Sequence, residues 1–124
     1  MASLMENLED ILDRERKEYE DLLEVSLKKS SVIVKGDLEA LNAITEEEQQ
    51  AVVRINRLDK EREKIMNDVA RVLNMDVKEL KLSDLLQVLE RRPQERQKFA
   101  ASYDRVKRAV LRMKEVNEQN RQLV

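Results

Sequence analysis

Two residue types that often carry out covalent or metal chemistry in proteins are missing from this sequence of 124 residues. It has no cysteine and no histidine, which excludes a thiol nucleophile, the commonest general base and the usual zinc ligands. One glycine, Gly36, leaves no glycine-rich phosphate loop. Glu46, Glu47 and Glu48 could hold a divalent cation only weakly, because consecutive helical residues point in different directions. We therefore expect no enzyme, no catalytic residue, no metal site and no cofactor.

The informative polar residues are those that interrupt apolar helical repeats. They are Glu15, Ser26, Glu48, Asp59, Arg62, Asn117 and Asn120. The three charged residues of the second repeat lie either at the wet edge of a small bundle, which is the commoner case, or where they set register or recognise a partner. An asparagine in a helical seam costs stability but specifies register or oligomeric state. Asn117 and Asn120 are therefore the strongest candidates for a specific contact.

The elements that carry these residues follow from the composition. Charged residues make up 40% and apolar residues 41% of the chain, with one glycine and one proline, a balance typical of long amphipathic helices. So few turn-forming residues exclude a many-stranded sandwich or barrel. We expect an all-α fold in one domain spanning residues 1–124, an antiparallel bundle of three long helices and one short helix with coiled-coil-like packing. The expected helices span about residues 4–35, 37–73, 83–91 and 93–123.

Helix boundaries are marked by a few residues. Ser3 with Glu6 matches a capping box, Gly36 suits the left-handed end of a helix, and Pro93 suits a first helical position. Asn74 can end the second long helix in the same left-handed conformation, and Ser83 is the expected cap of the short helix. The segment between them is expected to cross one end of the bundle and cover its apolar residues.

Charge is segregated along the chain. Residues 1–24 hold nine acidic and three basic side chains, net −6, and residues 91–114 hold nine basic and two acidic, net +7. The basic segment could bind nucleic acid or an acidic partner, or the two segments could neutralise each other within the bundle. Counting 100° per residue from Phe99 places basic residues on both flanks of the apolar stripe: Arg96, Lys107 and Lys114 on one, Lys98, Arg105 and Arg112 on the other. This arrangement favours neutralisation, with the first and last helices parallel neighbours.

No run of 18 apolar residues is present, and the acidic N-terminus lacks the features of a signal peptide. The sequence thus predicts a cytoplasmic protein without membrane insertion.

Several short motifs, in order and at fitting distances, resemble those of the FlgN-type flagellar export chaperones over essentially the whole chain. They are Glu15-x-x-x-Tyr19-x-x-Leu22-Leu23, Val34-Lys35-Gly36-Asp37-Leu38-x-x-Leu41, Thr45 with Glu48-Gln49, Ile55-x-x-Leu58, Arg62, and Asn117-x-x-Asn120-x-x-Leu123. The resemblance implies a chaperone of the bacterial flagellar type III export system. It would bind the C-terminal helical regions of hook-associated proteins, those of the hook–filament junction, prevent their premature assembly and deliver them to the export apparatus.

In that family the C-terminal region is the main substrate-binding part, which maps here to the end of the last helix. The partner-binding residues that we expect are Val106, Val110, Met113, Val116, Asn117, Asn120, Leu123 and Val124. Members of the family usually continue beyond the position of Val124, so either a short tail or an incomplete substrate site is expected here.

Two other functions are compatible with the residue pattern. A structural coiled-coil protein would fill its open seam with a second copy, pairing Asn117 and Asn120 across a homo-oligomer. A nucleic-acid-binding helical protein would use residues 91–114, although few aromatic residues are available to stack on bases. The chaperone hypothesis is favoured, and with it a protein partner and no nucleic acid.

Overall fold

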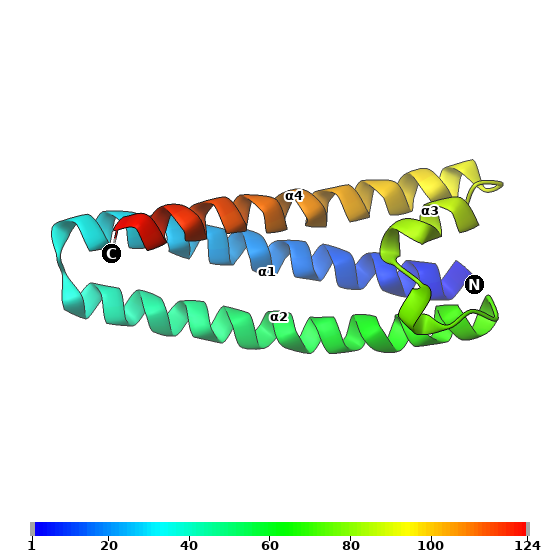
Figure 1. The fold of residues 1–124 in the computed structure, drawn as a ribbon, viewed down its shortest axis with the longest axis horizontal. Helices are drawn as coiled ribbons and strands as arrows, with labels where there is room; N and C mark the ends of the chain where they lie inside the picture. The colour runs from blue at the N-terminus through cyan, green and yellow to red at the C-terminus, as the bar shows by residue number, and fades with distance from the viewer. Residues whose placement is uncertain (1, 124) are drawn as a thin grey trace.

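The computed structural model describes residues 2–123, which fold as three long helices and a short crossing segment. In chain order these are α1 (Ala2–Lys35), α2 (Leu38–Val72), the 3-10 turns η1 (Val77–Glu79) and η2 (Leu82–Asp84), α3 (Leu85–Val88) and α4 (Pro93–Leu123). Figure 1 shows α1 and α4 running in the same direction, and α2 running back along the other side of α1. The predicted all-α bundle of three long helices and one short helix is confirmed.

The α1–α2 hairpin is closed by the single glycine. Gly36 has φ +70°, and its N–H donates to the carbonyl of Ile33 at 3.1 Å, which ends α1 in the left-handed conformation. Asp37 then caps α2, its carboxylate accepting from the N–H of Ala40 at 3.1 Å. Because this turn is so short, α1 and α2 must be antiparallel neighbours.

The crossing segment differs in detail from expectation. Asn74 has φ 56° and ends α2 as expected. Ser83, however, does not cap the short helix: it lies inside η2, where the carboxylate of Asp84 instead accepts from the N–H of Lys81 at 2.8 Å. The chain enters through this tight 3-10 turn, so the α-helical part shortens to Leu85–Val88, within the expected 83–91.

The core is concentrated at the base of the bundle, which we define as the end that holds the N-terminus of α1. Phe99, Leu8 and Leu12 are fully buried there, together with Leu85 and Leu89 of the crossing segment. The crossing segment thus covers the apolar base, as expected. Toward the hairpin end the core narrows to a second cluster consisting of Leu22, Ala51, Ile55 and Met113.

The parallel packing of α1 and α4 brings the acidic and basic segments together. Lys98 pairs with Glu9 across the two helices at 3.8 Å. Arg105 lies close enough to Asp13 to help Arg16 lower the pKa of that carboxyl. The predicted adjacency of the two segments is confirmed, and one flank of α4 is neutralised by α1.

Candidate partner-binding face

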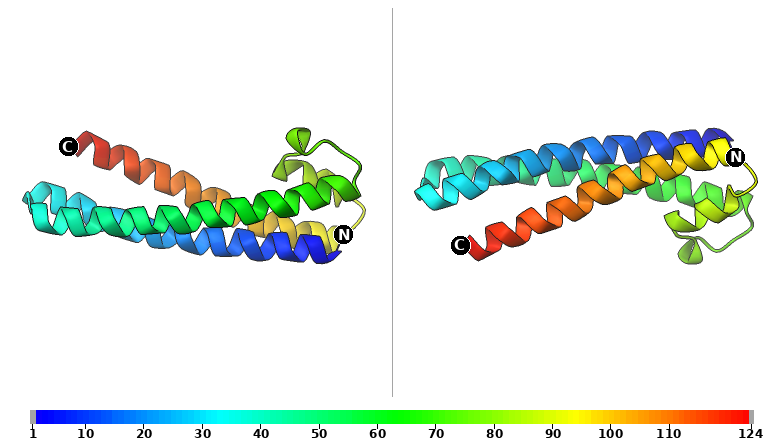
Figure 2. Two further views of the ribbon diagram at one scale, coloured as in Figure 1. Left: turned by 90° about the horizontal axis from the view of Figure 1, so that it is seen from below. Right: turned by 90° about the horizontal axis from the view of Figure 1, so that it is seen from above.

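The bundle is open on one side, because α2 and α4 both pack along α1 but barely touch each other. Figure 2 shows α4 diverging from the hairpin of α1 and α2 toward the C-terminal end. At the base, the crossing segment lies between α2 and α4 (Figure 1). Beyond it, toward the hairpin, no described element covers the strip between the two helices, and we call this strip the open face.

On α2, the open face is formed by one edge of the predicted seam. The opposite edge pairs with α1 through Arg54–Glu18 at 2.8 Å and Arg14–Glu61 at 3.5 Å. Helical geometry places Val52 and Asp59 on the other side of the line that packs on α1. Val52 is 45% exposed, while its neighbour Ala51 is buried against α1. This side of α2 stays accessible because α1 is the only long helix among the described residues that packs along it.

On α4, the predicted binding residues divide into two groups. Val106, Met113, Val116 and Asn120 are buried against α1, so they build the bundle rather than present a surface. Val110 is half-buried, Asn117 is exposed and Leu123 is 46% exposed. Val124 lies outside the described residues. Of the described residues in this set, only the second group keeps accessible surface, and helical geometry places Leu123 on the side of α4 away from Val110.

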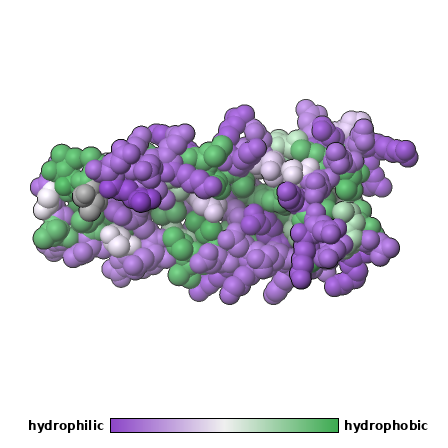
Figure 3. Space-filling view, in the orientation of Figure 1, coloured by the Kyte–Doolittle hydropathy of each residue, from purple (hydrophilic) through white to green (hydrophobic). Residues whose placement is uncertain are grey.

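Figure 3 looks at the molecule in the orientation of Figure 1 and shows hydrophobic surface in a broken line along its middle, with hydrophilic side chains on both sides. On α4 the half-buried Tyr103 and Val110 lie one heptad apart, and Asn117 follows after another heptad. A stripe with this spacing matches the apolar face of a further helix.

A polar cluster ties the three long helices together near the hairpin. Asn120 donates from Nδ2 to the carbonyl of Ser26 at 2.8 Å, and its Oδ1 accepts from the hydroxyl of Ser30. The buried Ser26 hydroxyl donates to Glu48 at 2.8 Å, and Lys29 pairs with the other Glu48 oxygen at 2.9 Å. Asn120 therefore sets the register of α4 on α1, and Glu48 is a structural residue.

A second polar group lies at mid-height, where Glu15 is only 1% exposed. Arg62 of α2 reaches it at 3.5 Å and also contacts Asp59 at 3.3 Å. Burial raises the pKa of Glu15 to about 7; the Arg62 charge opposes this rise and the nearby Asp59 carboxylate adds to it. One Glu15 oxygen, Oε1, is buried without a hydrogen-bond partner among the described residues. The sequence placed Glu15 on an apolar face, but its burial and its partners depend on how the helices pack.

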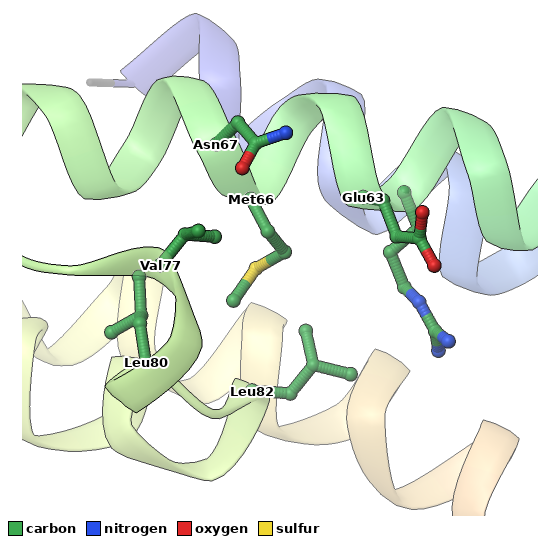
Figure 4. Close-up of a pocket in the computed structure, with 7 residues that line it drawn as sticks. Glu63, Met66, Asn67, Val77, Leu80 and Leu82 are labelled. Atoms are coloured by element: carbon green, nitrogen blue, oxygen red, sulfur yellow. The ribbon is translucent and has the colours of Figure 1, made fainter.

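Where the open face meets the crossing segment there is a pocket of about 430 Å³. Figure 4 shows Met66 of α2 pointing toward Leu82, with Val77 and Leu80 on one side. Glu63 and Asn67 lie along the α2 rim. Four apolar side chains form the floor and one wall of this pocket, and Arg62, Glu63 and Asn67 form the rest of its lining. Nothing in the helical periodicity pointed to this pocket, because the irregular crossing segment forms half of it.

No helix among residues 2–123 is both long enough and apolar enough to cross a membrane. Within the same residues, no three acidic side chains gather closely enough to hold a metal ion, and Glu48 turns inward while Glu46 and Glu47 are exposed.

Comparison of the sequence with known proteins identifies one matching protein family. A family model described as FlgN protein matches residues 1–124. No curated protein and no solved structure matches the chain. The family assignment therefore rests on the whole length of the sequence.

Proposed function

The chain belongs to the FlgN family of flagellar export chaperones, and we propose that it binds the C-terminal helical regions of hook-associated proteins. In this proposal it acts in the cytoplasm, keeps its clients unassembled and delivers them to the flagellar type III export apparatus. The observation that carries the proposal is the open face, the strip between α2 and α4 that no described helix covers on the hairpin side of the crossing segment.

The crossing segment indicates what kind of element fits between α2 and α4. At the base, Leu80, Leu85 and Leu89 are buried between the long helices. A client helix with a comparable apolar stripe would continue this packing along the uncovered strip. It would shield the client from self-assembly, because the same stripe would then be unavailable to other copies of the client.

The C-terminal half of α4 is the part best suited to contact the client. Val110 offers apolar surface, and Asn117 offers an amide that can donate and accept. An exposed amide in an apolar stripe penalises a client helix in a shifted register, because the amide would then be buried without a partner. This part of α4 packs on a small hydrophobic cluster of four buried residues, so its local stability is expected to be low. Low local stability favours the reversible binding that export requires.

The proposal is tested by titrating the full chain with a peptide from the C-terminal helical region of a hook-associated protein, using calorimetry. Asn117→Arg places a bulky charge on the open face and is expected to weaken binding by about tenfold or more. Gln119→Arg is the matched control, because Gln119 is exposed on the opposite side of α4.

Absence of saturable binding by the peptide would refute the proposed function. Equal effects of the two arginine variants would refute the placement of the site. Light scattering on the same samples shows whether a second copy of the chain occupies the open face. A dimer that dissociates when the peptide is added would mean that the peptide and the second copy compete for the same surface.

A further inference from the structure

The two basic flanks of α4 differ in the partners that the bundle provides. On one flank, Lys98 pairs with Glu9 and Arg105 lies beside Asp13, both from α1. On the other flank, Lys107 and Lys114 are exposed, and neither forms an ion pair with any residue among 2–123. Basic residues on one flank of α4 are therefore neutralised by acidic residues of α1, whereas Lys107 and Lys114 on the other flank are not. We call the side with Lys107 and Lys114 the unused flank.

The unused flank lies along the open face. Arg96 lies on the same side of α4 as Lys107, about three helical turns nearer the base. Its side chain donates to the carbonyl of Leu86 in the crossing segment at 3.1 Å. Lys107 and Lys114 continue along that same side of α4, past the end of the crossing segment. They are seven residues apart, about 10 Å along the helix, and lie beside the Tyr103 and Val110 stripe.

The opposite wall does not neutralise these two lysines. The α2 carboxylates that face this side are already engaged within the hairpin, Glu48 by Lys29 and Asp59 by Arg62. Glu63 forms no ion pair among the described residues, but it lies at the rim of the Met66 pocket, nearer the base. The α4 edge of the open face therefore presents two uncompensated positive charges beside an apolar stripe.

We propose that the open face selects an amphipathic helix that carries carboxylates one heptad apart along the edge facing α4, where they pair with Lys107 and Lys114. The apolar stripe provides contact area, and the two lysines determine which helices are accepted and in which register. This inference rests on the proposed function for the identity of the client, but it concerns the chemistry of the face itself. A helix with basic residues at the same positions would be repelled.

The test uses two designed helical peptides of about 28 residues with the same leucine stripe. One carries glutamates along the edge, and the other carries lysines at those positions. We expect the acidic-edge peptide to bind the full chain about tenfold more tightly, because reversing two exposed charge pairs changes attraction into repulsion. Its affinity should also fall as salt is raised.

The variant Lys107→Glu with Lys114→Glu should reverse this preference and favour the basic-edge peptide. The control is Lys28→Glu with Lys64→Glu, which makes the same change in net charge at exposed lysines pointing away from the open face. The control should keep the acidic preference. Because all four lysines are exposed, none of these changes removes core packing.

Equal binding of the two peptides, no binding of the acidic-edge peptide, or a control that behaves like the α4 pair would each overturn the inference. A third titration with the hook-associated peptide separates it from the proposed function. If that peptide fails to bind while the acidic-edge peptide binds as expected, the proposed client is wrong and the inference stands. If it binds equally to the parent chain and to the α4 pair, the client stands and the inference fails.

Discussion

The buried carboxyl of Glu15 makes the stability of this bundle depend on pH in an unusual direction. Its pKa is raised from 4.5 to about 7, chiefly by burial. The folded chain therefore holds the Glu15 proton more tightly than the unfolded chain does. This contribution is fully present below pH 4.5 and is lost as the pH rises through 7. Each tenfold change in a proton equilibrium is worth about 1.4 kcal/mol, so the loss amounts to about 3 kcal/mol.

Replacing Glu15 with glutamine keeps the shape of the side chain and removes its ionisation. Arg62 retains Asp59 at 3.3 Å and is partly exposed, so its charge stays compensated. We expect Glu15→Gln to raise the free energy of unfolding at pH 8 by about 3 kcal/mol and to leave it almost unchanged near pH 4.5. The chain has no histidine, but burial also raises the pKa of Glu9, so a smaller part of the pH dependence should remain in Glu15→Gln.

The assay is urea unfolding followed by circular dichroism at a series of pH values from 4.5 to 8. The parent chain should lose stability over this range, whereas Glu15→Gln should lose much less. Glu24→Gln makes the same charge change at an exposed position of α1 and serves as the control. A parent chain whose stability is constant from pH 5 to 8, or a Glu15→Gln variant less stable than the parent at pH 8, would refute this reasoning.

Three further changes test the packing that supports the open face. Asn120→Ala removes the hydrogen bonds to Ser26 and Ser30; it should cost about 1–3 kcal/mol and speed amide exchange in the last turns of α4. Gly36→Ala meets no atom within 4 Å but must adopt φ +70°, so it should cost about 1 kcal/mol in thermal unfolding without altering the helix content. Phe99→Ala empties the centre of the base cluster and should cost about 3–5 kcal/mol in urea, and a smaller loss would mean that the crossing segment collapses into the space.

Local sequence was enough to predict the helices and most of their ends. Gly36 and Asn74 are predictable as left-handed ends because few residue types adopt a positive φ, and Pro93 is predictable as a first helical position because it lacks an N–H. These signals act within a few residues and do not need a tertiary partner. The prediction that Ser83 caps the short helix is wrong, because the neighbouring Asp84 accepts the hydrogen bond of this turn and both residue types cap helices.

The residues that make up the site could be nominated from the sequence, but their roles could not. Asn117 and Asn120 occupy adjacent positions of the same heptad pattern, yet Asn120 is buried on Ser26 and Asn117 is exposed. Likewise, Lys98 and Lys107 both flank the apolar stripe, and only Lys98 meets an acidic residue of α1.

The sequence by itself therefore determined the helices, their order and the family to which they belong. Only the tertiary structure decided which side of each helix is covered. Periodicity describes a single helix and specifies an apolar stripe without saying how many neighbours share it. Here α1 has two long neighbours while α2 and α4 each have one, and that difference leaves the strip between α2 and α4 uncovered.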